Sequence, residues 1–186
     1  MIRPARPSDF PFVVPLIIGA MKDVVRVFIN DDDPGKALPL FEHFFKLRNN
    51  QYSYENTLVF VDAEDQICGS VTAYDGGLLD SYRKPFIDYL QDNYGLRDFD
   101  PGQETEAGEY YLDTVSVAPG RWGSGIGKEL ILAAIEHART LEYERVGLIV
   151  DKKNPMAKKL YQRLGFQVIK DRLFMGGEYE HMQFVL

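Results

Sequence analysis

The glycine-rich segment VAPGRWGSGIGK, from Val117 to Lys128, has the clearest potential for chemistry in this sequence of 186 residues. Four glycines fall within eight residues, directly after the apolar run EYYLDTVSV and directly before the helix-like run GIGKELILAAIEHARTL. Because glycine lacks Cβ and tolerates unusual backbone angles, successive N–H groups of such a loop can converge on phosphate oxygens at the positive end of a helix. The segment therefore predicts a phosphate-binding loop.

Two of the known phosphate-binding patterns fit this loop poorly. A P-loop requires glycine and Ser or Thr at two places where the chain has Trp and Glu, so it is excluded. The dinucleotide fingerprint G-x-G-x-x-G fits Gly123 and Gly125 but has Lys128 in place of its third glycine. Asp151, which ends the next apolar run, is placed like the acid that binds a ribose in that fold. A dinucleotide-dependent oxidoreductase is therefore kept as an alternative, which binding of NAD(P) would reveal.

A third pattern fits better: the loop resembles the acyl-CoA loop of the GNAT superfamily of N-acetyltransferases, V-x-P followed by Arg/Gln-x-x-Gly-x-Gly/Ala. The matching residues are Val117, Pro119, Gly123, Gly125, Ile126 and Gly127. The later segment NPMAKKLYQRLGF, from Asn154 to Phe166, resembles the second signature of that family. The early IRPARPSD resembles its first strand and turn. The resemblance covers the chain from end to end and is specific between Leu112 and Phe166.

This resemblance implies how the ligands bind. Acetyl-CoA, the co-substrate, would lie between two splayed strands, with its pantetheine on the backbone of Val115 to Val117 and its pyrophosphate on the amides of Gly123 to Gly127. An amine would attack the thioester directly in a ternary complex, and a backbone N–H of the fourth strand would stabilise the oxyanion. The implied cofactor-binding residues are Val115, Ser116, Val117, Arg121, Trp122, Gly123, Ser124, Gly125, Ile126, Gly127, Lys128 and Asn154. No metal is expected.

Four residues are candidates for roles in the reaction. The family match implies that Tyr161 is the general acid for the leaving thiolate, although its place on an apolar helix stripe also fits a core tyrosine. For Asn154 two roles remain open: it contacts the cofactor, as the family match implies, or it only caps a helix. Asp113 and Glu109 share one strand parity, and either could accept the proton of the amine. A strand bulge would change that parity. Asp113 is preferred, because a carboxylate so near an apolar strand core needs an explanation.

The loop departs from the family pattern at one place. Trp122 occupies the position that normally holds Arg or Gln, and Arg121 lies one residue earlier. A register shift of one residue would let Arg121 reach the phosphates and turn Trp122 onto the adenine or the protein surface. The alternative is that Trp122 simply packs.

Charge is distributed unevenly along the chain. The net charge of −7 argues against nucleic-acid binding. Residues 1–120 carry 10 Lys/Arg against 20 Asp/Glu, whereas residues 121–172 carry 11 against 6. A chance asymmetry on solvated surfaces would explain this. The alternative is an anionic ligand on the basic block and a cationic amine acceptor on the acidic part, such as a polyamine, an aminoglycoside or a basic peptide end.

Composition bounds the class of protein. No run reaches the roughly 18 apolar residues of a membrane span, and MIRPARPSDF lacks the features of a signal peptide, so we expect a cytoplasmic protein with no membrane partner. A single cysteine and three scattered histidines predict neither disulfides nor a metal cluster. Dimers are common among proteins similar to this one, so the resemblance also implies a homodimer. The function expected is N-acetyl transfer from acetyl-CoA to an amine, with a non-catalytic acyl-CoA-binding or regulatory module as the alternative.

The elements that must position these residues alternate between strand and helix. The sequence predicts an α/β fold, a single GNAT-like domain over residues 1–186 with a mixed, mostly antiparallel sheet, flanking helices and a central splayed parallel strand pair. We expect helices over 12–27, 36–49 and 80–94, a strand-helix-strand unit around the glycine loop, and a helix from Pro155 to Gly165. Two hairpins turn at 63–66 and at 176–177. Residues 76–108 form an acidic insertion of irregular pattern.

Overall fold

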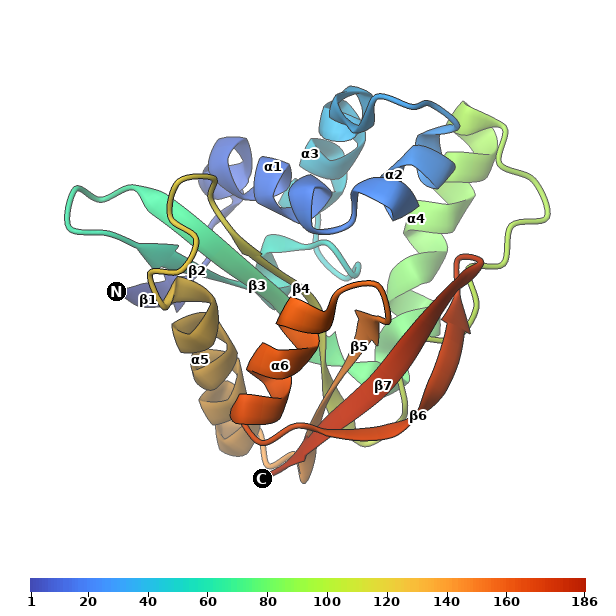
Figure 1. Ribbon diagram of the computed structural model, residues 1–186. Coiled ribbons are helices and arrows are strands. Elements are labelled where there is room, and N and C mark those ends of the chain that lie inside the picture. The colour runs from blue at the N-terminus through green and yellow to red at the C-terminus, as the bar shows by residue number, and fades with distance from the viewer.

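The computed structural model describes residues 1–186, whose strands form one seven-stranded sheet in the order β1-β2-β3-β4-β5-β7-β6 (Figure 1). The strands are β1 (Ile2–Pro4), β2 (Thr57–Val61), β3 (Ile67–Asp75), β4 (Glu109–Val117), β5 (Arg145–Asp151), β6 (Gln167–Phe174) and β7 (Gly177–Val185). The helices are α1 (Phe10–Ala20), α2 (Lys22–Ile29), α3 (Leu38–Lys46), α4 (Leu79–Tyr94), α5 (Ile126–Thr140) and α6 (Pro155–Arg163). Only β4 and β5 pair in parallel. The expected mixed, mostly antiparallel sheet is thus confirmed.

The parallel pair at the centre of the sheet is short. Residues Glu109–Tyr111 of β4 pair with Arg145–Gly147 of β5, and the two strands pair no further. Beyond this point β4 stays bonded to β3 and β5 stays bonded to β7. The register of β4 on β3 slips so that Asp113 has no partner, which is a β-bulge. Since a bulge bends its strand and increases the local twist, it helps β4 diverge from β5, and the splayed pair is confirmed.

Helices cover both faces of the sheet (Figure 1). On one face, apolar residues of α1 to α4 form a core with Val59 and Val61 of β2. On the other face, α5 packs on β3, β4 and β5, and partly buried residues of α6 join the same core. No helix is both long and apolar enough to cross a bilayer.

The N-terminal helix differs from the expectation. A single helix over 12–27 was predicted, but the structure has two, separated at Met21, where φ is −133° and ψ is 39°. The apolar pattern did not show this break because α1 is apolar on nearly all sides, whereas α2 is strongly amphipathic. The second predicted helix is also shorter, because Pro34–Ala37 form a 3₁₀ turn before α3.

The acidic segment of residues 76–108 consists of α4 and a loop that is anchored to the body of the protein. Thr105 donates a hydrogen bond of 2.6 Å to the carbonyl of Gly76, and Arg83 donates one of 2.9 Å to the carbonyl of Gly102. Glu104 and Thr105 are both buried. The loop therefore brings an acidic side chain into the interior, beside β4.

Candidate active site

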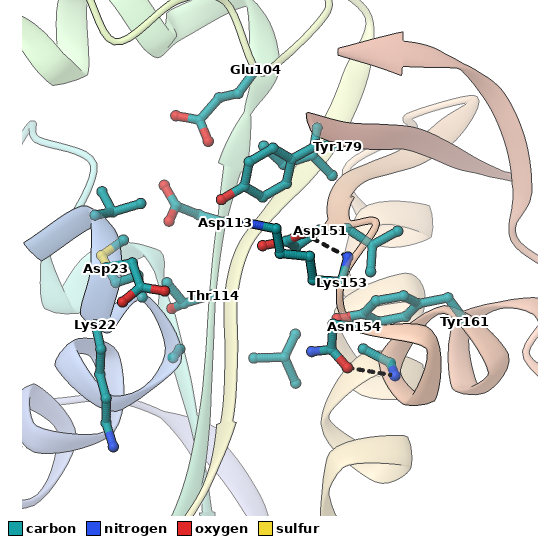
Figure 2. Close-up of a pocket in the computed structure, with 17 residues that line it drawn as sticks. Lys22, Asp23, Glu104, Asp113, Thr114, Asp151, Lys153, Asn154, Tyr161 and Tyr179 are labelled. Atoms are coloured by element: carbon teal, nitrogen blue, oxygen red, sulfur yellow. Dashed lines mark hydrogen bonds between the residues drawn. The ribbon is translucent and has the colours of Figure 1, made fainter. Parts of the chain in front are cut away.

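A cavity of about 540 Å³ opens where β4 and β5 diverge (Figure 2). Its walls come from six parts of the chain: β4, β5, the α1–α2 junction, the start of α6, one residue of the acidic loop and one residue of β7. The lining residues with polar or charged side chains are Lys22, Asp23, Glu104, Asp113, Thr114, Asp151, Lys153, Asn154, Tyr161 and Tyr179. The break between α1 and α2 thus contributes one wall of the cavity.

Asp113 presents one carboxylate oxygen to this cavity. Its Oδ2 accepts hydrogen bonds from the Tyr74 hydroxyl at 2.6 Å and from Nε2 of Gln51 at 3.3 Å. Its Oδ1 has no protein partner. Burial, followed by the negative charge of Glu104, raises the pKa of Asp113 to about 7, against the opposing effect of the hydrogen bond from Tyr74. A carboxyl with this pKa exchanges a proton readily near neutral pH, as a general base must.

Glu104 lies on the same cavity, and Figure 2 shows its carboxylate on the same side as that of Asp113. Its two oxygens accept from the guanidinium of Arg83 and, at 2.9 Å, from the hydroxyl of Tyr111. Burial raises the pKa of Glu104, while Arg83 opposes the shift. A pair of acidic side chains, Glu104 bonded to Arg83 and Asp113 bonded to Tyr74, therefore forms this end of the cavity.

Tyr161 of α6 and Asn154, the residue directly before α6, line the cavity (Figure 2). The Tyr161 ring is partly exposed, whereas the protein atoms around its hydroxyl desolvate that group and raise its pKa to about 12. Asn154 Oδ1 accepts from the N–H of Ala157 at 3.1 Å and so caps the helix. The hydroxyl of Tyr161 forms no hydrogen bond within the chain and stays protonated across the neutral range.

The glycine loop offers a row of free donors. The N–H groups of residues 122–128 donate to no acceptor in the chain, since the first bond of α5 runs from Glu129 to Gly125. Gly123 and Gly125 adopt φ of 78° and 89°, which side-chain-bearing residues rarely adopt. Seven successive amides at the N-terminus of a 15-residue helix are suited to an anion.

The open edge of β4 adds a second binding feature. Val115, Ser116 and Val117 pair with β3 on one side, and no strand covers their other side, because β5 has already diverged. Apart from the carbonyl of Val117, which accepts a hydrogen bond from the indole of Trp122, backbone groups on this side are available to an extended ligand. The edge connects the glycine loop to the cavity that holds Asp113.

Residues 26–166 match the model of the Acetyltransferase (GNAT) family. The chain belongs to this family. A solved acetyltransferase is 28% identical and superposes with a TM-score of 0.80, covering 100% of this chain and 98% of its own. An N-acetyltransferase from Staphylococcus aureus Mu50 has a TM-score of 0.83 at 22% identity, covering 99% of this chain and 100% of its own, and this likeness shows the fold alone.

A curated relative matches over a shorter stretch of this GNAT chain. The mycothiol acetyltransferase of Pseudarthrobacter chlorophenolicus is 45% identical over 65 residues, which are 35% of this chain and 20% of that protein. The chain thus spans about a fifth of that relative's length. GNAT acetyltransferases use acetyl-CoA as acyl donor. The free amides of the glycine loop and the open edge of β4 fit a pyrophosphate joined to an extended amide chain.

Three side chains of the GNAT loop are held within the protein, those of Arg121, Trp122 and Ser124. A guanidinium nitrogen of Arg121 lies 2.7 Å from Oδ2 of Asp62. The indole N–H of Trp122 donates to the carbonyl of Val117 at 2.8 Å, yet 74% of Trp122 is exposed. Ser124 donates to the carbonyl of Arg121 at 2.5 Å, whereas Lys128 has no ion pair.

Glu109 lies apart from the other residues named by the sequence. It is fully buried at the paired end of β4, against Gly147, and accepts hydrogen bonds from Gln183 at 2.8 Å and from the N–H of Glu106 at 2.8 Å. Nε2 of His181 lies 3.0 Å from one of its oxygens. Glu109 does not line the cavity. The bulge at Asp113 removes the shared parity that made the two carboxylates look equivalent.

Several residues of the site were not among the sequence candidates. Tyr74 and Gln51 donate hydrogen bonds to Asp113. Glu104 adds a second carboxylate to the cavity, and Asp23 and Tyr179 also line it. Glu104 belongs to the acidic segment of residues 76–108, and the acidity of that segment was the only sequence feature that pointed to this residue. Nothing in the local sequence marks Gln51 or Tyr74, because each reaches Asp113 through tertiary structure.

Proposed function

We propose that this protein is an N-acetyltransferase that transfers the acetyl group of acetyl-CoA to an amine by direct attack. One observation carries the proposal: Asp113 on β4 and Tyr161 on α6 face a single cavity, and the open β4 edge connects that cavity to a loop of free amides. A proton acceptor and a proton donor thus flank the place where the thioester and the amine meet.

In the proposed reaction, the amine arrives as an ammonium ion and gives one proton to Asp113, directly or through water. The freed lone pair attacks the thioester carbonyl carbon, so a C–N bond forms while a backbone N–H of β4 stabilises the oxyanion, an interaction type that contributes roughly 10²–10³ in rate. The C–S bond then breaks, and Tyr161 gives its proton to the sulfur. The second proton of the nitrogen restores Tyr161, so the products are an amide, CoA thiol and one proton.

The acceptor that we propose is cationic. Four carboxylates line the cavity, those of Asp23, Glu104, Asp113 and Asp151, against two lysines, Lys22 and Lys153. Arg83 neutralises Glu104 from outside this lining. The excess of negative charge favours an ammonium group over a carboxylate-bearing acceptor. The mycothiol acetyltransferases share too short a segment with this chain to assign it their acceptor.

The experiment is a measurement of CoA thiol release by the purified protein with acetyl-CoA and a broad amine panel that includes polyamines, aminoglycosides, peptides and amino acids. Turnover with a cationic acceptor, lost in Asp113→Asn, supports the proposal. Binding of acetyl-CoA with no turnover on any acceptor would favour the non-catalytic module. If carboxylate-bearing acceptors prove best and polyamines are inert, the charge argument is wrong.

We also propose that the protein is cytoplasmic and that it forms a homodimer. The free, buried thiol of Cys68 suits the reducing cytoplasm. The edge strand β6 exposes Val168, Ile169 and Leu173, which supports a homodimer through this edge. Light scattering on the purified protein measures the oligomeric state directly.

A further inference from the structure

A second depression, the loop groove, lies on the outer side of the glycine loop. It has a volume of about 580 Å³ and is lined by Val117, Arg121, Trp122, Gly123, Gly125, Ile126, Gly127, Lys128, Met156, Leu160, Arg163 and Leu164. It shares no lining residue with the active-site cavity, although β4 and α6 contribute to both. A ligand that follows the β4 edge away from the cavity therefore enters the loop groove.

Trp122 is the large aromatic side chain of this groove, and it is fixed without being buried. Its indole N–H is bonded to the Val117 carbonyl, which restrains the ring, yet 74% of the residue stays exposed. Exposed Met156, with 69% accessibility, lies on the same groove. A restrained aromatic face beside apolar neighbours is suited to stacking against a flat ring.

The groove also carries positive charge and no carboxylate. Lys128 and Arg163 line it, and neither forms an ion pair within the chain. Arg121 also lines it but is bound to Asp62. The loop groove thus combines a stacking surface, two free cations and the free amides of the loop. A nucleotide with phosphate groups on both sides of its ribose has the complementary chemistry.

We propose that Trp122 is the stacking platform for the adenine ring of CoA, and that Lys128 and Arg163 bind the ribose phosphate next to it. This inference rests on the proposed function, because it places the nucleotide of the acyl donor. Trp122 stands where the family pattern has Arg or Gln. Stacking at this position would help the protein to select CoA over shorter acyl-pantetheine donors, which lack the nucleotide.

The test uses the fluorescence of Trp122, which is the only tryptophan of the chain. We expect CoA and adenosine 3′,5′-bisphosphate to quench it, because both bring adenine onto the indole, and pantetheine to leave it unchanged. Calorimetry on the same samples measures binding independently of the tryptophan signal. If calorimetry shows that CoA binds while the fluorescence does not change, the stacking assignment is wrong and the proposed function is untouched. If CoA does not bind, both fail.

Variants separate stacking from loop stability. Trp122→Ala should weaken CoA binding about tenfold and spare pantetheine, since stacking of one base on an aromatic ring has an effect of this order, and Trp122→Phe should restore most of the loss. Arg163→Gln should weaken CoA but not 3′-dephospho-CoA, with Arg139→Gln on α5, outside the groove, as the matched control. Equal losses for CoA and pantetheine in Trp122→Ala would show that Trp122 only supports the loop and would overturn the inference.

Discussion

The hydroxyl of Tyr74 on β3 donates a hydrogen bond of 2.6 Å to Oδ2 of Asp113 on the neighbouring strand β4. This bond fixes the carboxyl group and leaves its Oδ1 as the oxygen that faces the cavity. It also stabilises the charged form, in opposition to the burial that raises the pKa of Asp113 to about 7. The pKa of the proposed base is therefore lowered by a phenol that does not itself line the cavity.

Tyr74→Phe should move the acidic limb of the kcat/KM–pH profile upward by about one pH unit. Loss of one hydrogen bond to the carboxylate removes roughly 1–2 kcal/mol of stabilisation of the charged form, and 1.36 kcal/mol corresponds to one pKa unit. Tyr82→Phe, which removes the hydroxyl of a neighbouring tyrosine with no bond to Asp113, is the control. An unmoved limb in Tyr74→Phe would mean that Asp113 is not the titrating base.

Glu104→Gln should move the same limb downward, because the charge of Glu104 raises the pKa of Asp113. Arg83→Gln should move it upward, because the charge of Arg83 lowers that pKa. Both variants break one buried ion pair and both are expected to lower the melting temperature. Opposite displacements of the two pH profiles therefore separate electrostatics from damage to the fold, and displacements of the same sign would contradict the account.

Asp113→Asn should stabilise the fold more at pH 8 than at pH 5. An acid whose pKa is higher in the folded chain than in the unfolded chain destabilises folding as the pH rises between the two values, here from 3.8 to about 7. Asparagine carries no such charge, and one oxygen still accepts from Tyr74. Melting temperatures of both proteins at the two pH values measure the difference. If the difference in melting temperature between the two proteins shrinks as the pH rises, burial does not destabilise the charged form of Asp113.

Gly125→Ala should abolish the stabilisation of the fold by acetyl-CoA. At 100 times its Kd, a ligand stabilises a protein by about 2.7 kcal/mol, or roughly 5–10 °C in a domain of this size. No protein atom lies within 4 Å of the added Cβ, so the expected damage comes from the φ of 89° and from obstruction of the phosphates. Gly19→Ala, equally free of contacts but on α1, should keep the full stabilisation. A full ligand response in Gly125→Ala would argue against phosphate binding on this loop.

Tyr161→Phe should lower kcat by about 10² while acetyl-CoA affinity stays the same, since the CoA thiol is a fairly good leaving group and general acid catalysis typically contributes 10²–10⁴. The pKa of about 12 keeps the hydroxyl protonated over the assay range. Tyr143→Phe, in the turn between α5 and β5 and outside the lining of the cavity, is the matched control. Unchanged kcat under conditions where chemistry limits the rate would leave Tyr161 as a packing residue.

The parts of this site that the sequence predicts are those encoded locally. The glycine loop, the Asn154 cap and the strand-helix-strand unit depend on residues that are near each other in the chain, and their spacing was sufficient. The environment of Asp113 depends on Gln51 and Tyr74, 62 and 39 residues away, and on a bulge that no local pattern marks. Nothing in the sequence marked the break at Met21 either. Because α1 is apolar on nearly all sides, it has no apolar stripe whose interruption would mark the end of the helix.

The most direct test of the central claim is transfer of label from radiolabelled acetyl-CoA to an acceptor amine in a single turnover, followed by mass spectrometry of the product. The wild-type protein should form one acetylated amine and free CoA in equal amounts, and Asp113→Asn should bind acetyl-CoA normally but form product far more slowly. Equal rates of amide formation in the two proteins, or CoA release without any acetylated amine, would contradict it.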